Sequence, residues 1–250
     1  MLGNLGIIQA CLPTGRTELC LRRRFGGRPL LEWIIRRVTD CTRLDGVIVL
    51  TCNDAAHRAV RSMIPLDVPV LAGDVSDPLH QFAQALEEYP AEGVVRVRAD
   101  SPFVDPGLID RLVATAQAHP EADYVSYCSR DGRPAILSPV GVYAEWLRAA
   151  SLRKADRAAR EPTDRKQVTS YIYSHPEKFQ LRLVPAPERI DRDDVRLSVA
   201  ADEDWEHALA IYDALGPEGL EWQRIAELLD HQPMLRSRMA ALNRAVATSE

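Results

Sequence analysis

The sequence lacks the apolar segments that would place it in or across a membrane. No run in its 250 residues approaches the roughly 18 consecutive apolar residues of a membrane-spanning helix. The opening "MLGNLGIIQACLP" has no basic stretch of the kind that precedes the apolar part of a secretion signal. We therefore expect no membrane partner, no secretion, and a cytoplasmic location.

Cysteine is also scarce, and the chain has no excess of positive charge. The five cysteines are an odd, unpatterned set with no Cys-x-x-Cys, which argues against a disulfide framework or a zinc site and predicts reduced thiols. A net charge of −5 and a pI of about 5.7 disfavour a nucleic-acid surface. A local basic loop can still bind a small polyanion, so we expect no nucleic-acid partner but leave room for phosphates.

Two common nucleotide-binding motifs are missing as well. There is no Gly-x-x-x-x-Gly-Lys-Ser/Thr and no Gly-x-Gly-x-x-Gly, which excludes the usual ATPase loop and the dinucleotide fingerprint. The stretch 6–33 nevertheless passes from an apolar tetrad through a loop into a helical pattern. That layout can present backbone N–H groups and a helix N-terminus to an anion.

The first half of the chain alternates apolar runs with amphipathic helical patterns. Four such pairs predict a doubly wound α/β fold with a mostly parallel sheet covered on both faces. Proline and aspartate stand where helices should start, for example at Asp77 and Pro106. The expected strands are 6–10, 46–51, 69–71 and 93–99, and the first and fourth should pair in parallel.

The pattern changes near Asp123. We expect strands at 123–129 and 136–144, a basic helix from Glu145, a further strand near "QLRLVPA", and a return to the sheet at 195–200. These features predict one domain over 1–250, with an inserted arm or substrate subdomain at 130–192 and C-terminal helices at 217–250.

The carboxyl ends of the parallel strands are where a ligand should bind. The loop 10–25 and the segment "VRADSPFVDP" both end there, and Asp100 directly follows its strand. A carboxylate at that place suits Mg²⁺, and a basic loop opposite it suits nucleotidyl transfer. Simpler interpretations remain open: Asp100 as a turn or N-cap residue, Arg22 to Arg24 as a solvated edge, and Thr14 with Gly15 as a turn.

Four motifs resemble the cytidylyltransferase group of sugar nucleotidyltransferases, most closely the spore coat polysaccharide biosynthesis protein F branch. That branch begins I-I-Q-A-R-M-x-S-x-R-L-P-G-K, followed by G-x-P-L-L-E. The matching residues are Ile7, Ile8, Gln9, Ala10, Thr14, Arg16, Gly27, Pro29, Leu30, Leu31 and Glu32. The pattern V-V-R-I-T-x-D-C-P-L-I-D-P matches "VVRVRADSPFVDP", H-V-T-x-Y-I-x-x-x-P-x-x-F matches "QVTSYIYSHPEKF", and L-T-V-D-T-x-E-D matches "LSVAADED".

The resemblance implies a Rossmann-like fold of the nucleotide-diphospho-sugar transferase type, with an inserted β/α dimerisation arm and hence a homodimer. Its more distant relatives include the synthetases of CMP-3-deoxy-manno-octulosonate and CMP-sialic acid. It also implies Mg²⁺-dependent transfer of a nucleotidyl group from an NTP, CTP in this group, to a sugar or sugar acid in surface polysaccharide biosynthesis. Arg16 and Asp100 would be catalytic, with Asp100 on the metal. The nucleotide-binding residues would be Ile8, Gln9, Ala10, Thr14, Gly15, Arg16 and Arg98.

Four departures fall where that chemistry needs side chains. Cys11 stands for the first loop arginine, Glu18 and Cys20 for the closing proline and lysine, and Ala200 for an aspartate after "LSV". Losing a cation aimed at a phosphate commonly costs on the order of a hundredfold in rate. Arg22 to Arg24, or Asp202, could compensate.

The departures leave two functions in competition. The first is an active cytidylyltransferase-like enzyme with an altered loop. The alternative is a degenerate member that binds a nucleotide or sugar as a regulatory or scaffold protein. Guanylyl transfer to a molybdenum cofactor is weaker, because the glycine-rich first loop it requires is absent.

Overall fold

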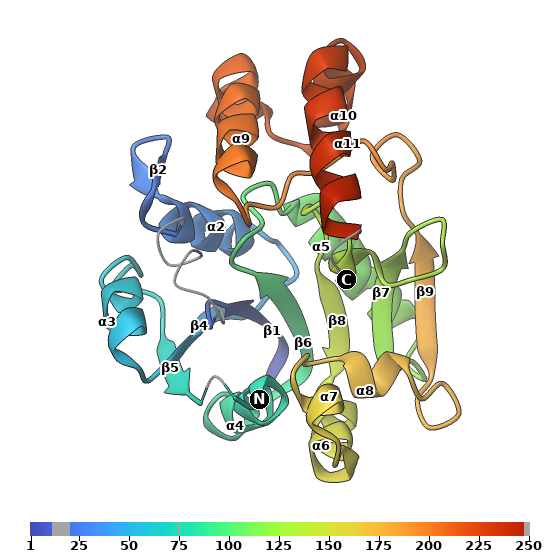
Figure 1. The fold of residues 1–250 in the computed structure, drawn as a ribbon. Helices are drawn as coiled ribbons and strands as arrows, with labels where there is room; N and C mark the ends of the chain where they lie inside the picture. The colour runs from blue at the N-terminus through green and yellow to red at the C-terminus, as the bar shows by residue number, and fades with distance from the viewer. Residues whose placement is uncertain (12–20, 75, 248–250) are drawn as a thin grey trace.

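A seven-stranded sheet forms the centre of the computed structural model, which describes residues 1–11, 21–74 and 76–247 (Figure 1). The strand order is β5-β4-β1-β6-β8-β7-β9. The sheet strands are β1 (Leu2–Gln9), β4 (Gly46–Cys52), β5 (Val70–Gly73), β6 (Ala91–Arg98), β7 (Tyr124–Cys128), β8 (Glu145–Arg148) and β9 (Leu181–Pro185). A short hairpin of β2 (Arg24–Phe25) and β3 (Arg28–Pro29) lies outside it.

Most strand pairs are parallel, as the sequence predicts. β1 pairs in parallel with both β4 and β6, so Gln9 lies between Leu50 and Arg98 at the carboxyl edge. β8 alone runs against its neighbours β6 and β7. The α/β fold class and the parallel pairing of the first and fourth predicted strands are confirmed.

Helices cover both faces of the sheet. The α-helices described are α2 (Leu30–Thr39), α3 (Ala55–Arg61), α4 (Pro78–Glu88), α5 (Pro106–Ala118), α6 (Ala149–Ala158), α7 (Pro162–Arg165), α8 (Ser170–Tyr173), α9 (Asp202–Leu215), α10 (Trp222–Asp230) and α11 (Pro233–Ala247), with single 3₁₀ turns at η1 (Ala135–Leu137) and η2 (Pro217–Gly219). One core joins the sheet to α2, α5, α9 and α10, and a second joins it to α4, α6 and α8. In Figure 1, α4, α6, α7 and α8 group below the sheet and α9 to α11 above it.

Aspartate and proline fix the starts of two helices that lead away from the carboxyl edge. The Asp77 carboxylate accepts the His80 N–H at 3.0 Å, and Asp105 accepts the Leu108 N–H at 2.9 Å. In each helix the next residue is proline, whose missing N–H would have no helical partner at that position. These local signals determine where the loops at the carboxyl edge of the sheet end and the helices α4 and α5 begin.

The second half departs from the predicted elements in two places. Residues 138–144 form no strand, and the strand begins instead at Glu145, where a helix was predicted. Residues 195–200 also form no strand, because the N–H groups of Leu197 and Ser198 donate to Pro139 O and not to a sheet neighbour. The two extended segments pack against each other closely, since a Cβ on Gly141 would meet the Ser198 nitrogen at 2.6 Å.

The predicted arm, 130–192, supplies strands to the central sheet. β8 and β9 both come from it, and β9 takes the edge position beside β7. The C-terminal region 217–250 supplies α10 and α11, with Ile225, Leu229 and Met239 in the first core. Of the helices described, none has the length and apolar character needed to cross a membrane.

Candidate functional site

Strand β6 has apolar side chains on one face and, near the carboxyl edge of the sheet, polar side chains on the other. Val95, Val97 and Ala99 lie in the first core, so the alternation of a strand turns Arg96 and Arg98 to the opposite face. Asp100 lies two residues beyond the end of β6 and is buried. The sequence therefore delivers two guanidinium groups and a carboxylate in a row toward the edge at which parallel-sheet ligands bind.

Arg98 and Asp100 form an ion pair at this edge. Arg98 Nη2 contacts Asp100 Oδ2, and Arg98 Nη1 donates to the Ile136 carbonyl at 3.2 Å. The other carboxylate oxygen accepts the Ser101 hydroxyl at 3.2 Å. The backbone also holds Asp100 in place, because its carbonyl accepts the Val199 N–H at 2.7 Å.

That last contact brings the start of α9 beside Asp100. The N–H groups of Ala200 and Ala201 both donate to Asp204 Oδ2, at 3.0 and 2.9 Å. Asp204 is buried and accepts two further bonds from Arg196, at 2.6 and 3.0 Å. Its carboxylate is thus committed to capping α9 and to an ion pair, and Ala200 has no oxygen in its side chain.

Two arginines of the cluster Arg22 to Arg24, which could replace the missing loop lysine, bond other partners in the structure. Arg23 pairs with Asp202, the other carboxylate considered as compensation, and its guanidinium lies 5.6 Å from the Trp205 ring centre. Arg24 Nη1 donates to the Gly27 carbonyl at 2.6 Å. In this structure, Arg23 and Asp202 therefore neutralise each other at the start of α9.

The donor set at Asp100 suits one kind of divalent cation. Within 1–11, 21–74 and 76–247, no three His, Cys, Asp or Glu side chains are grouped to hold a metal. Mg²⁺ nevertheless often binds through one or two carboxylates together with substrate phosphates and water. Asp100 and the Ser101 hydroxyl fit that mode, and any incoming cation must displace the Arg98 guanidinium.

Behind the ion pair lies a buried polar network centred on Glu145. This carboxylate is completely buried and accepts bonds from Arg96 and from the hydroxyls of Tyr124 and Thr169. Arg96 Nε also donates to Gln9 Oε1 at 2.8 Å. Burial first, and the nearby Glu145 charge second, raise the pKa of Tyr124 well above its ordinary value. The network joins β1, β6, β8 and the start of α8 beneath the candidate site.

Sequence reasoning did not identify Glu145 or Thr169 as part of the site. Glu145 was expected to begin a helix, but it pairs with Arg96 across the antiparallel β6 and β8 ladder. The available signal was a glutamate between Ala144 and Trp146 in an otherwise apolar stretch. Such a buried acid requires a cationic partner, and Arg96 is the buried arginine of the neighbouring motif.

Three predicted nucleotide-binding residues lie in β1 or directly after it. Ile8 is fully buried, Gln9 enters the Glu145 network through its side chain, and the Ala10 N–H donates to the Leu50 carbonyl at 2.8 Å. Thr14, Gly15 and Arg16 lie outside the described residues. Of the predicted set, the structure brings together Arg98 and Asp100, with Gln9 in register beside Arg98.

The cysteine prediction is wrong for one pair. Cys11 and Cys52 are joined as a disulfide, with their Cα atoms 5.3 Å apart, while Cys41 and Cys128 are free thiols. The register of β1 and β4 explains this, because Gln9 opposite Leu50 brings Cys11 opposite Cys52. Spacing along the sequence gives no sign of such a contact between neighbouring parallel strands. Burial raises the pKa of the Cys41 thiol to about 12, so that thiol is unreactive.

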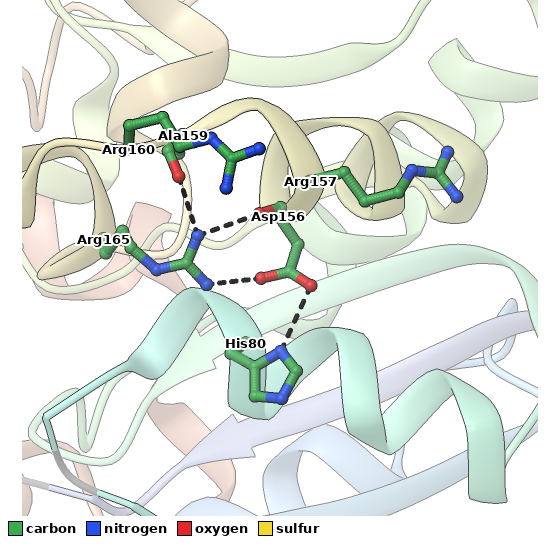
Figure 2. Close-up of a pocket in the computed structure, with 6 residues that line it drawn as sticks. All are labelled: His80, Asp156, Arg157, Ala159, Arg160 and Arg165. Atoms are coloured by element: carbon green, nitrogen blue, oxygen red, sulfur yellow. Dashed lines mark hydrogen bonds and ion pairs between the residues drawn. The ribbon is translucent and has the colours of Figure 1, made fainter.

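A second polar cluster lies between α4, α6 and α7 (Figure 2). Arg165 is its centre and bonds Asp77, Asp156 and the carbonyls of Asp156 and Ala159. His80 Nδ1 lies 3.1 Å from Asp156 Oδ2. Because Arg165 is shared by two carboxylates and two carbonyls, we interpret the cluster as a clamp that fixes the three helices, and place the candidate site at Asp100.

The chain is similar to known proteins over most of its length. A family model described as cytidylyltransferase matches residues 6–227. An uncharacterized protein of Methanocaldococcus jannaschii is 28% identical over 93% of this chain and 93% of its own. The spore coat polysaccharide biosynthesis protein SpsF of Bacillus subtilis is 27% identical over 85% of this chain and 87% of its own.

Solved structures share the fold. A cytidylyltransferase from Leptospira borgpetersenii has a TM-score of 0.78 at 20% identity, covering 93% of this chain and 95% of that one. A CMP-2-keto-3-deoxy-manno-octonic acid synthetase solved with CTP has a TM-score of 0.63 at 11% identity, covering 85% and 99%. A Mycobacterium tuberculosis protein solved with manganese has a TM-score of 0.58 at 17% identity, covering 83% and 98%. At these identities the likeness shows the fold alone.

Proposed function

The chain belongs to the cytidylyltransferase family, and on that premise we propose that it transfers a cytidylyl group from CTP to a sugar or sugar acid. The acceptor oxygen would attack the α-phosphorus, and the bond to the bridging oxygen would break to release pyrophosphate. The similarity to a spore coat polysaccharide biosynthesis protein supports a role in making surface polysaccharide. The predicted cytoplasmic location belongs to this proposal.

The observation that carries the proposal is the placement of Asp100. It is a buried carboxylate at the carboxyl edge, one residue beyond the last hydrogen bond of β6 with β1, and the predicted nucleotide loop leaves β1 beside it. Asp100 would hold Mg²⁺, with Ser101 beside it. The cation would supply charge neutralisation for the α-phosphate and the leaving pyrophosphate.

Other residues of the chain have distinct parts in this scheme. Arg98 and, from the loop outside the described residues, Arg16 would bind phosphate oxygens, because guanidinium groups make paired bonds to phosphate. Backbone groups of Ala10 to Gly15 would surround the nucleotide. The Glu145 network would keep β6 and the Thr169 segment in fixed relation, so that the acceptor side of the pocket does not shift during transfer.

The test is pyrophosphate release with a panel of NTPs and sugar phosphates or sugar acids. Asp100→Asn keeps the shape of the side chain and removes its charge, so turnover should fall about a hundredfold or more. Asp67→Asn is the matched control, because Asp67 is an exposed carboxylate before β5 that pairs only with Arg36 among the described residues. Turnover that is insensitive to Asp100→Asn would contradict the assignment.

A second candidate function has its own observation. Cys11 is tied to Cys52, Asp100 is paired with Arg98, and Ala200 provides no second carboxylate. These features fit a family member that binds CTP or a sugar without transferring it and acts as a regulatory or scaffold protein. Calorimetry distinguishes the two functions: micromolar CTP binding with no pyrophosphate release over hours supports the binding protein, and rapid release excludes it.

The oligomeric state belongs to the same proposal. We propose a homodimer formed through 130–192, the region that resembles the dimerisation arm. Leu183 is one of the few large apolar side chains that are exposed, and it lies on the edge strand β9. An unpaired strand edge with an apolar side chain can pair with a second chain. Light scattering at micromolar concentration should give a dimer, and only monomer would contradict the proposal.

A further inference from the structure

Arg98 does more at this edge than the family pattern requires. The pattern that matches "VVRVRADSPFVDP" has threonine where this chain has Arg98. The Arg98 guanidinium contacts Asp100 Oδ2, which is the oxygen that a divalent cation would also take. A threonine at 98 could not supply a positive charge there.

The two side chains of the ion pair are buried to different extents. The Asp100 side chain is 6% exposed and the Arg98 side chain is 32% exposed. An ionised carboxylate so enclosed needs a counter-ion, and Arg98 is the cationic side chain that bonds it in the described part of the chain. The Arg98 side chain, by contrast, is partly exposed to water, so its guanidinium can leave the carboxylate without becoming a fully buried charge.

Arg98 is also held loosely enough to move. Among the described residues, its other side-chain bond is to the Ile136 carbonyl, at 3.2 Å from Nη1. A guanidinium carries five N–H donors and binds phosphate oxygens in pairs. A triphosphate beside Asp100 would therefore offer Arg98 a new partner of higher charge than the carboxylate it leaves.

We propose that Arg98 is an exchangeable counter-ion that closes Asp100 to divalent cations until a nucleotide is present. In the nucleotide-free protein it holds the carboxylate. When a triphosphate arrives, Arg98 passes to the phosphates and Asp100 is released to bind the metal that accompanies them. The second half of this exchange rests on the proposed function, whereas the first half concerns the protein and the metal alone.

The first half can be tested with Mn²⁺ and no nucleotide. Binding of Mn²⁺ to the full chain is followed by electron paramagnetic resonance of the free ion. Wild type should bind weakly, and Arg98→Gln should bind about tenfold more tightly or better, because an opposite charge next to a carboxylate commonly shifts its equilibria by one or more decades. Adding Asp100→Asn to Arg98→Gln should abolish the gain.

Two controls separate this effect from net charge and from damage to the fold. Arg43→Gln also removes one positive charge. Arg43 precedes β4, at the end of the sheet opposite to the carboxyl edge, and bonds Gln117. This variant should bind Mn²⁺ as wild type does. Arg98→Lys keeps a charge and should stay within a few-fold of wild type. Thermal unfolding checks that each variant folds, and Arg98→Met takes the place of Arg98→Gln if that variant does not.

Each result of the Mn²⁺ experiment either supports or overturns the proposed role of Arg98. Equal Mn²⁺ affinity in wild type, Arg98→Gln and Arg43→Gln would overturn the proposal, as would tight Asp100-dependent binding to wild type without nucleotide. A gain confined to the variants that lack the Arg98 charge supports it, even if no CTP turnover is ever found. Failure of pyrophosphate release would then count against the proposed function and leave the Arg98 exchange intact.

Discussion

The two faces of the central sheet are built from alternate residues of the same strands, yet their chemistry differs. On one face of β6, Val95 and Val97 pack under α2, α5, α9 and α10 in an apolar core. On the other face, where Val94 joins the second apolar core, Arg96 and Arg98 carry charge into the protein. The first face fixes the frame, and the second uses that frame to hold charges that would otherwise be too costly to bury.

Aromatic packing shows how firmly the apolar face is fixed. Phe25 is fully buried, and its ring centre lies 4.6 to 5.8 Å from those of Trp33, Phe103, Trp205 and Tyr212. These rings join the β2–β3 hairpin, α2, the loop after β6 and α9. The segment that carries Asp100 is thus anchored in the first apolar core through Phe103.

The largest expected effect comes from breaking the charged network on the polar face. Glu145→Gln leaves Arg96 buried without its counter-charge, which should lower the free energy of unfolding by about 3–5 kcal/mol. Denaturant unfolding measures this change. The double variant Arg96→Met with Glu145→Leu should recover most of the loss, because well-packed apolar pairs commonly replace buried ion pairs without net cost. A single-variant loss below about 1 kcal/mol would show that the network contributes little to stability.

A smaller effect is expected on the apolar face. Ile35→Val in α2 removes one methyl group from a fully buried side chain and should cost about 0.5–1.5 kcal/mol. Nucleotide and Mn²⁺ binding should not change, because the deletion touches no charge at the edge. A change in ligand affinity with a stability loss in this range would mean that the two faces are coupled more tightly than their separate cores indicate.

The smallest effect concerns pH. His207 in α9 is buried, and its Nδ1 has no hydrogen-bond partner among the described residues. Burial lowers the pKa of His207 below its ordinary value of 6.5, against the nearby Asp204, which raises it. The unfolded chain therefore binds the proton more readily than the folded chain. The contribution of neutral His207 to the free energy of unfolding is complete above pH 6.5 and is lost as the pH falls through the lowered pKa.

Comparison with His207→Gln isolates that contribution. The melting temperature of wild type should fall more between pH 7.5 and pH 5.5 than that of the variant, because the carboxylates that titrate in the same range are shared by both proteins. An identical fall in the two proteins would show that His207 does not titrate differently in the folded state.

Local patterns in the sequence were sufficient for the first half of the fold. The alternation of apolar runs and helical patterns predicts β1, β4, β5 and β6 to within a few residues, and Asp77 and Pro106 predict helix starts. The second half was harder, because Glu145 in an apolar stretch reads as a helix start until its partner is known. Whether a residue pairs across a sheet depends on a neighbour 49 positions away, which no local window contains.

The sequence by itself determined the fold class, the family motifs and the placement of Asp100 after its strand, since each depends on short-range periodicity or on residues in fixed order. Only the tertiary structure decided which side chains meet: Arg98 with Asp100, Glu145 with Arg96, and Cys11 with Cys52. The physical reason is that strand register and burial select the partners of a charge or a thiol. Those are properties of the packed sheet, and they set what the carboxyl edge can bind.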